Sequence, residues 1–173
     1  MTAKPQEPSP FWTFSLRIYG RPGVPAACLA LQNGSGVDVN VMLFGLFLAN
    51  AGRSLDAADV AAIASAVEAW KADVVVPLRR VRTLLKSPPA VVDSAGAAAL
   101  RDRVKAVELE AERLQQEALF AAFPAATTGA PRARDTAARD GLLAYQTHLG
   151  VVFDAAAVGT ILAAFATIED TRT

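Results

Sequence analysis

Apolar side chains recur every three or four residues along most of the chain. This spacing places them on one face of an α-helix, whereas a half-buried β-strand needs strict alternation. The longest apolar stripe runs from Val60 to Leu85, about seven turns of helix, and Pro77 is expected to kink it near Asp73 and Val74. Because no stretch alternates over four or more residues with β-branched enrichment, the pattern predicts an all-α protein.

Capping residues and helix breakers divide the chain into six or seven expected helices. The first helix covers about residues 10–19, and the second covers residues 24–32. Residues 33–36 connect the second helix to a third over residues 39–50. The N-cap candidates, whose side chains can accept hydrogen bonds from a first helical turn, are Ser9, Asp38, Asp56, Asp93 or Ser94, Asp135 and Asp154.

A second long stripe follows the chain break at residues 87–89. Its apolar positions fit a heptad seam and are Leu100, Val104, Val107, Ala111, Leu114 and Ala118. Two long helices joined by a short break favour an antiparallel hairpin. We therefore expect a single-domain helical bundle of six or seven helices. In it, the N-terminal helices pack across the long antiparallel helical hairpin and two C-terminal helices close the core.

The expected domain organisation is simple. Residues 10–169 form the single helical domain, and residues 124–134 form a mobile linker within it, because they are rich in Pro, Ala, Thr and Gly. Residues 1–9 are a disordered N-terminal tail and residues 170–173 a C-terminal tail. The first ten residues contain no apolar core typical of a secretory signal. The longest apolar run, Val41 to Ala49, is far shorter than a membrane span, so we expect a cytoplasmic protein.

Charge and rare residues narrow the chemistry. The 173 residues carry 17 basic and 17 acidic side chains, and this balance argues against a dedicated nucleic-acid module, since phosphate binding needs a basic excess. With only Cys28 and His148, the chain offers no zinc-ligand spacing and no Glu-x-x-His pair. We therefore expect neither a metal nor another cofactor.

Half of the aromatic side chains lie in the first 47 residues: Phe11, Trp12, Phe14, Tyr19, Phe44 and Phe47. The segment follows the pattern FWxFSLxxYxxPGVxxACLxLQ over residues 11–32 and then GxDVNxxLF over residues 36–44. This pattern resembles that of an uncharacterised bacterial family built on a domain of unknown function. The resemblance implies a cytosolic bacterial protein with no assigned activity.

The same segment contains the polar side chains that are the best candidates for a ligand site. A pocket near the aromatic segment would be lined by Trp12, Arg17, Tyr19, Gln32, Asp38 and Asn40. The structural alternative is that Asp38 caps its helix and Asn40 bonds the 33–36 loop. Arg17 then pairs with Asp38 or lies near a helix C-terminus, which favours cations without any ligand.

A basic run at the end of the first long helix comprises Arg79, Arg80, Arg82 and Lys86. The second long helix carries Glu108, Glu110, Glu112 and Glu117. An antiparallel hairpin would bring these two runs together, so we expect pairing between the helices. A patch for nucleic acid or phospholipid is the alternative, but no aromatic side chains are interleaved with these charges.

No catalytic constellation stands out. Cys28 lies in an apolar helix without an obvious base nearby, which favours a buried, inert thiol. His148 has no accompanying Gly-x-Ser-x-Gly elbow. These features favour a non-enzymatic cytosolic interaction or regulatory module, with an unidentified protein partner docking on the aromatic segment or on the charged face of the hairpin. The alternative hypothesis is a small-ligand-binding helical protein, either an enzyme or a non-enzymatic binder, with its pocket near the N-terminal aromatic segment.

Overall fold

The computed structural model of the chain describes residues 7–168. Within this range the chain is all-α, as expected. It also contains two strands of two residues each, which were not expected. The elements are α1 (Pro10–Tyr19), α2 (Val24–Ser35), α3 (Val39–Asn50), β1 (Arg53–Ser54), α4 (Ala57–Trp70), the π-helical segment η1 (Lys71–Val75), α5 (Val76–Leu84), α6 (Ser94–Ala122), β2 (Ala130–Pro131), α7 (Arg134–Leu149) and α8 (Ala155–Ala166). Most of the expected N-terminal tail (residues 1–6), residue 169 and the expected tail 170–173 lie outside the described residues.

Most helices begin where the expected caps predict. The Ser9 hydroxyl accepts a hydrogen bond from the main-chain N–H of Trp12 at 3.1 Å. The Asp56 carboxylate caps α4 and forms a capping box with Asp59, so that two otherwise unpaired N–H groups gain partners. The side chains of Asp38, Asp93 and Asp154 also accept hydrogen bonds from main-chain N–H groups, in the first turns of α3, α6 and α8.

Two helix boundaries differ from expectation. α7 begins at Arg134, after an N-cap position occupied by Ala133, so the cap assignment of Asp135 is wrong. α2 continues into the expected connection, ends at Ser35 and is capped by Gly36. The φ of Gly36 is 68°, a left-handed conformation that terminates helices and suits glycine, and this allows α2 to run three residues further.

The helix around Pro77 is continuous from Ala57 to Leu84 but contains one irregular turn. This turn is η1, which lies where the kink was expected, and the N–H of Val76 bonds the carbonyl of Lys71, five residues earlier. Proline has no N–H with which to continue the α-helical ladder. The sequence therefore predicted the place of the irregularity, and the structure shows that it is a π-bulge.

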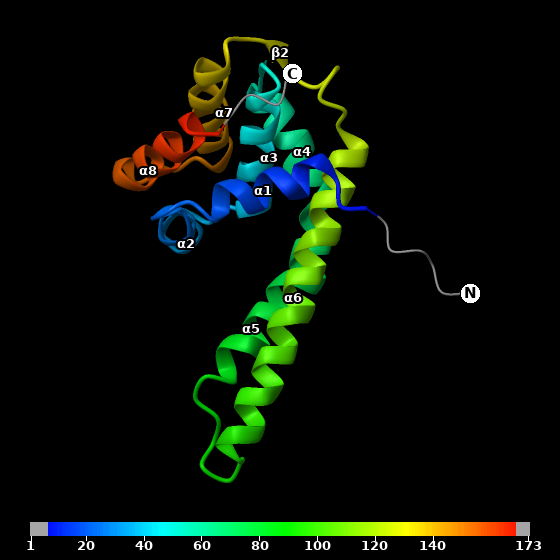
Figure 1. Ribbon diagram of the computed structural model, residues 1–173, viewed down its shortest axis with the longest axis vertical. Coiled ribbons are helices and arrows are strands. Elements are labelled where there is room, and N and C mark those ends of the chain that lie inside the picture. The colour runs from blue at the N-terminus through cyan, green and yellow to red at the C-terminus, as the bar shows by residue number, and fades with distance from the viewer. Residues whose placement is uncertain (1–6, 169–173) are drawn as a thin grey trace, which may run out of the picture.

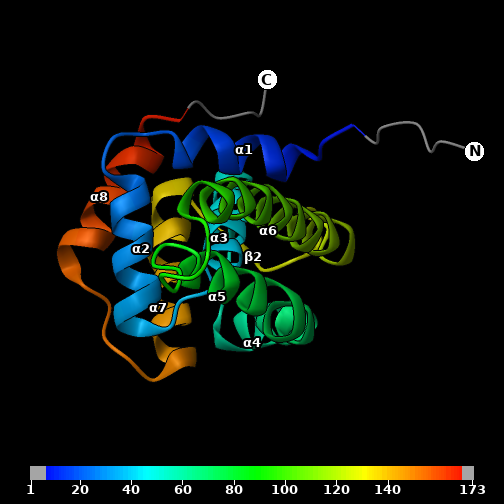
Figure 2. The same ribbon diagram turned by 90° about the horizontal axis from the view of Figure 1, so that it is seen from below.

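α5 and α6 lie side by side and project from the rest of the molecule as a long hairpin (Figure 1). The remaining helices form the body, in which α3 packs against α7, and α2 lies against α8 (Figure 2). No helix in the described range combines the length and apolar character that crossing a membrane requires.

The aromatic side chains of α1 join the body to the base of α6. Phe11 stacks edge-on against Phe44 of α3, with ring centroids 4.9 Å apart, and Phe14 contacts Phe47 at 5.7 Å. Phe120, Phe123 and Phe165 add further rings from α6, the segment after it and α8. The buried apolar cluster runs from Phe11 to Ile168, and this supports our proposal that residues 10–169 form a single domain.

The heptad seam expected on α6 is wrong. Leu100, Val107 and Leu114 are 41%, 54% and 43% exposed. Of the expected seam, Ala111 is buried. The other buried residues of α6 are Ala97, Glu108, Gln115, Gln116 and Leu119. Polar partners on other helices decide this orientation: Arg79 and Arg82 bind Glu108, and the indole N–H of Trp70 donates to the carbonyl of Ala111 at 3.0 Å.

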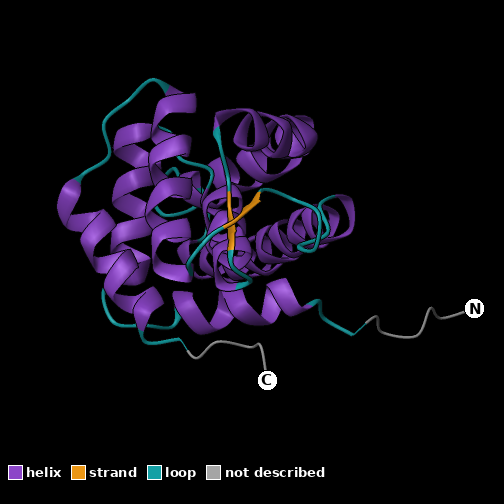
Figure 3. Ribbon diagram, turned by 90° about the horizontal axis from the view of Figure 1, so that it is seen from above, coloured by secondary structure: helices purple, strands orange, loops and turns teal. Residues whose placement is uncertain are grey.

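Residues 124–134, the expected linker, pass beside the start of α4. Two residues of this segment pair antiparallel with β1, as the short strands in Figure 3 show. The guanidinium of Arg53 also donates to the carbonyls of Thr128 and Gly129. These contacts fix a path for the segment across the body, whereas its mobility stays a prediction.

Candidate functional site

A cavity of about 360 Å³ lies where α1, α2, α3, α5 and α6 meet, at the base of the hairpin. Its apolar wall comprises Trp12, Leu16, Leu29, Val39, Leu43 and Leu109. Uncharged polar groups come from Ser15, Tyr19, Gln32, Asn40 and Gln116, and charged groups from Arg79, Arg82, Lys105, Glu108 and Glu112. An apolar body with a few polar groups is typical of small-molecule sites.

Four of the six residues expected to line a ligand site line this cavity: Trp12, Tyr19, Gln32 and Asn40. Asp38 lines an adjoining cavity of about 190 Å³, which Gln32 and Asn40 also border. Arg17 is exposed and borders neither cavity. Within the described part of the chain, Arg17 forms no ion pair with Asp38, so their proposed pairing is not found. The ligand-binding role of these residues stays a prediction.

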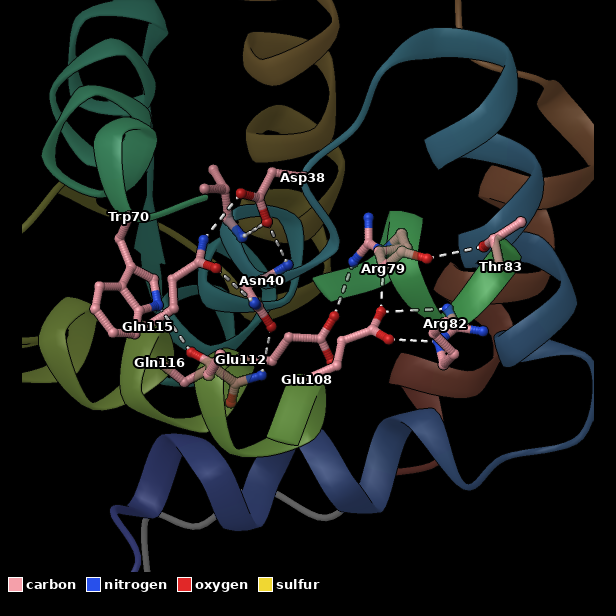
Figure 4. Close-up of polar contacts among 12 residues, drawn as sticks. Asp38, Asn40, Trp70, Arg79, Arg82, Thr83, Glu108, Glu112, Gln115 and Gln116 are labelled. Atoms are coloured by element: carbon pink, nitrogen blue, oxygen red, sulfur yellow. Dashed lines mark hydrogen bonds and ion pairs between the residues drawn. The ribbon is translucent and has the colours of Figure 1, made fainter. Parts of the chain in front are cut away.

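Asp38 and Asn40 belong to a chain of four hydrogen-bonded side chains between α3 and α6 (Figure 4). Gln115 Nε2 donates to Asp38 Oδ2 at 2.9 Å, and Asn40 Nδ2 donates to Gln115 Oε1 at 3.0 Å. Gln116 Nε2 then donates to Asn40 Oδ1 at 2.8 Å. Asp38 Oδ1 separately accepts from the N–H groups of Asn40 and Val41. Asp38 therefore caps its helix, as the structural alternative predicted, and also anchors a buried amide chain. The Asn40 side chain binds Gln115 and Gln116, so the expected bond to the 33–36 loop is wrong.

Ion pairs between α5 and α6 form the charged wall of the cavity. Arg79 donates to Glu108 at 3.2 Å and to Glu112 at 2.8 Å, and Arg82 also binds Glu108. The expected pairing of the two charged runs is therefore confirmed at these four residues. Glu110 and Glu117 instead pair with Arg113 on their own helix.

These pairs leave the two acids in different environments. Glu108 is 5% exposed and is held by two guanidinium groups. Burial raises the pKa of the Glu112 carboxyl, although Arg79 opposes this effect. The hydrogen bond to Glu108 raises the pKa of Arg82. Charge in this wall is thus balanced largely within the protein.

Cys28 and Tyr19 complete the titratable groups of the cavity. Burial raises the pKa of the Cys28 thiol to about 11, and its side chain is 1% exposed. The thiol is therefore protonated near neutral pH, which is consistent with the expected inert cysteine. Burial also raises the pKa of Tyr19, whose side chain remains 42% exposed at the cavity mouth.

Two buried oxygen atoms of the cavity residues lack hydrogen-bond partners within residues 7–168: Ser15 Oγ and Gln116 Oε1. Their side chains are each 3% exposed. Gln116 Oε1 points away from Asn40 and toward α1, the helix that carries Ser15 (Figure 4). An unpaired buried oxygen costs about 1–3 kcal/mol, so it is a specific place for a ligand donor.

The sequence interpretation missed Ser15, Gln115 and Gln116. Ser15 lies in an aromatic helix and has no accompanying motif. The adjacent glutamines stand between Leu114 and Ala118 of the expected heptad seam and are not part of it. Two adjacent amides inside a long helix were the available signal, but they indicate burial only once the facing helix is known.

The described residues contain no group of three His, Cys, Asp or Glu side chains close enough to hold a metal ion. A comparison with curated proteins and a comparison with solved structures found no match for the chain. A family model matches residues 10–119, which include every residue that lines the larger cavity. α7 and α8 lie beyond the match. The chain belongs to the family described as "Protein of unknown function (DUF2390)".

Proposed function

We propose that this protein binds a small organic molecule in the cavity between α1, α2, α3, α5 and α6. The observation that carries the proposal is the pair of buried oxygens, Ser15 Oγ and Gln116 Oε1, without hydrogen-bond partners among residues 7–168. A bound hydroxyl or N–H group would satisfy such an atom and recover the cost of leaving it unpaired.

The walls of the cavity support the same function. A volume of about 360 Å³ suits a small organic molecule. Trp12, Leu16 and Leu29 supply apolar surface near its mouth, where Leu16 and Leu29 are more than half exposed. Burying that surface under a ligand is favourable by roughly 25 cal/mol per Å². The proposal is limited to binding, because no nucleophile with an activating base lines the cavity in the described residues.

A cavity-blocking variant tests the proposal. Leu29 lines the cavity mouth, whereas Val107 lies on α6 outside it, and both side chains are 54% exposed. We would titrate a panel of aromatic alcohols, amines and amides into ¹⁵N-labelled protein and follow the indole N–H resonance of Trp12. Saturable shifts that disappear in Leu29→Trp but persist in Val107→Trp support binding in the cavity. If no compound shifts Trp12, or if Leu29→Trp binds as wild type does, the proposal is wrong.

The interaction module expected from the sequence remains the second candidate. The aromatic side chains Phe11 and Phe14 are buried in the core, so the docking surface would be another one. Its support is the outer part of the hairpin, where exposed apolar side chains gather: Val81, Leu84, Val91, Val92 and Leu100. Clusters of this kind mark interaction sites.

We take the partner on this surface to be a second copy of the chain. A net charge of zero gives two copies no overall repulsion, and two apolar hairpin ends can cover one another. Sedimentation equilibrium over a wide concentration range tests this idea. A dimer that Leu84→Gln weakens supports it, and a monomer at every concentration contradicts it. The cytoplasmic location and the bacterial origin stay predictions.

A further inference from the structure

The hydrogen bonds between Asp38 and Gln116 run in one direction. An ionised carboxylate can only accept, so Gln115 must turn its amino group toward Asp38. The carbonyl oxygen of Gln115 then faces Asn40 and accepts from Asn40 Nδ2. Each amide has one donor end and one accepting end, so the orientation of the first amide determines that of the next.

The last amide of the chain, that of Gln116, lines the cavity together with Asn40. Asn40 presents Oδ1 to Gln116, so Gln116 must use its amino group for this bond. Its carbonyl oxygen remains as the free end, buried and without a partner in the described residues. The charge on Asp38 thus fixes which atom of Gln116 is free, although Asp38 itself lies in the neighbouring cavity.

We propose that Asp38 is a positioning residue that sets the hydrogen-bonding polarity of the cavity, so that the site selects ligands with a hydroxyl or N–H donor for Gln116 Oε1. The inference rests on the proposed binding function and adds the ligand class to it. Asp38 acts through Gln115 and Asn40 and does not touch the ligand.

The substitution Asp38→Asn reverses the chain while it keeps the helix cap. Asparagine caps helices about as well as aspartate, because its Oδ1 accepts from the same N–H groups. Its Nδ2 then faces Gln115, which must turn its carbonyl toward position 38. Asn40 and Gln116 must turn in response, and Gln116 presents its amino group to the cavity. We therefore expect this one substitution to convert an acceptor site into a donor site.

Three probes measure the hydrogen-bonding polarity of the cavity, and their binding is followed by shifts of the Trp12 indole N–H resonance. Indole donates one hydrogen bond, 1-methylindole lacks that donor, and acetophenone offers only an acceptor. Wild type should bind indole about three- to tenfold more tightly than 1-methylindole, the range that a net hydrogen bond of about 1 kcal/mol gives. In Asp38→Asn this preference should disappear and the affinity for acetophenone should rise by a similar factor. Asp56→Asn, at the exposed cap of α4, is the matched control and should behave as wild type.

Side-chain amide NOEs in unliganded wild type give a second readout that needs no variant. The Gln116 amino protons should show NOEs to Asn40 and none to residues of α1. The opposite pattern overturns the inference even if Asp38→Asn fails to fold. Binding with the same probe preference in wild type and Asp38→Asn also overturns it, while the binding function stands. If no probe binds wild type, the ligand class loses its basis together with the proposed function.

Discussion

Arg79 on α5 donates from Nε to Oε1 of Glu108 on α6, at 3.2 Å. The bond crosses the interface of the projecting hairpin and helps select the face of α6 that is buried. Since Arg82 binds the same carboxylate, Glu108 is shared by two guanidinium groups at a site that is 5% exposed, and Arg79 also pairs with Glu112. The hairpin therefore depends on an ionic contact at a buried position next to Val107 of the expected apolar seam.

Glu108→Gln should destabilise the protein by about 1–3 kcal/mol, because two partly buried guanidinium groups lose their shared anion. Urea unfolding followed by circular dichroism measures the change. The matched control is Glu110→Gln, which removes an exposed acid paired only with Arg113 of the same helix. We expect the control to change the midpoint far less than Glu108→Gln does, because an exposed ion pair contributes little. Equal midpoints for the two variants would contradict a structural role for the Glu108 contacts.

Glu112 should make the protein less stable as pH rises. Burial raises its pKa in the folded state, so the folded protein binds more protons than the unfolded chain between the ordinary and the raised pKa. The free energy of unfolding of wild type should therefore fall, relative to Glu112→Gln, as pH rises through that interval. Unfolding measurements at a series of pH values from the ordinary Glu pKa upward give this difference.

Glu110 supplies the control of opposite sign. The hydrogen bond from Arg113 lowers the pKa of Glu110, so its contribution is present above the ordinary pKa and is lost as pH falls through the lowered value. The difference between wild type and Glu110→Gln should thus increase with pH. Slopes of the same sign for the two variants would show that burial does not control the ionisation of Glu112.

Cys28 should resist alkylation in the folded protein. A rise in its pKa from 9.0 to about 11 lowers the thiolate fraction near neutral pH by about 100-fold, and the 1% exposure slows reagent access further. Iodoacetamide labelling, followed by mass spectrometry, compares native protein with protein in urea. Native labelling as fast as that in urea would rule out this burial. Wild type is the sample for both arms, since the chain has one cysteine.

Gly129 should be far less tolerant of substitution than Gly34. Gly129 has a φ of 72°, and an added Cβ would collide with the main-chain carbonyl oxygen of Ser54 on β1. We expect Gly129→Ala to cost about 2–4 kcal/mol, from the left-handed conformation and the collision. Gly34 lies in α2 with nothing within 4 Å of its added Cβ. Gly34→Ala should therefore raise the free energy of unfolding by up to about 1 kcal/mol. Thermal unfolding of both variants checks the order, and a neutral Gly129→Ala would mean that residues 124–134 do not hold the path described.

Local physical chemistry made much of the fold predictable. Ser9 and Asp38 cap helices because a short oxygen-bearing side chain reaches the free N–H groups of the next turn, whatever the rest of the chain does. Pro77 predicts an irregular turn from an equally local property, because the missing N–H belongs to the residue itself. These signals act within a few residues, so they can be read from the sequence.

The candidate site depended on partners distant in sequence. Arg17 and Tyr19 are near neighbours on α1, yet Tyr19 borders the cavity and Arg17 does not. The apolar spacing on α6 predicted that the face carrying Leu114 is buried. Gln115 and Gln116 are buried instead, because Asp38 and Asn40 lie opposite them.

The sequence by itself determined the helices, most of their caps and the position of the π-bulge, because each follows from contacts within about one or two turns. Only the tertiary structure decided which face of α6 is buried and which polar groups surround a cavity. A buried polar side chain is stable only when its partner is in place, and that partner is here about 75 residues away along the chain.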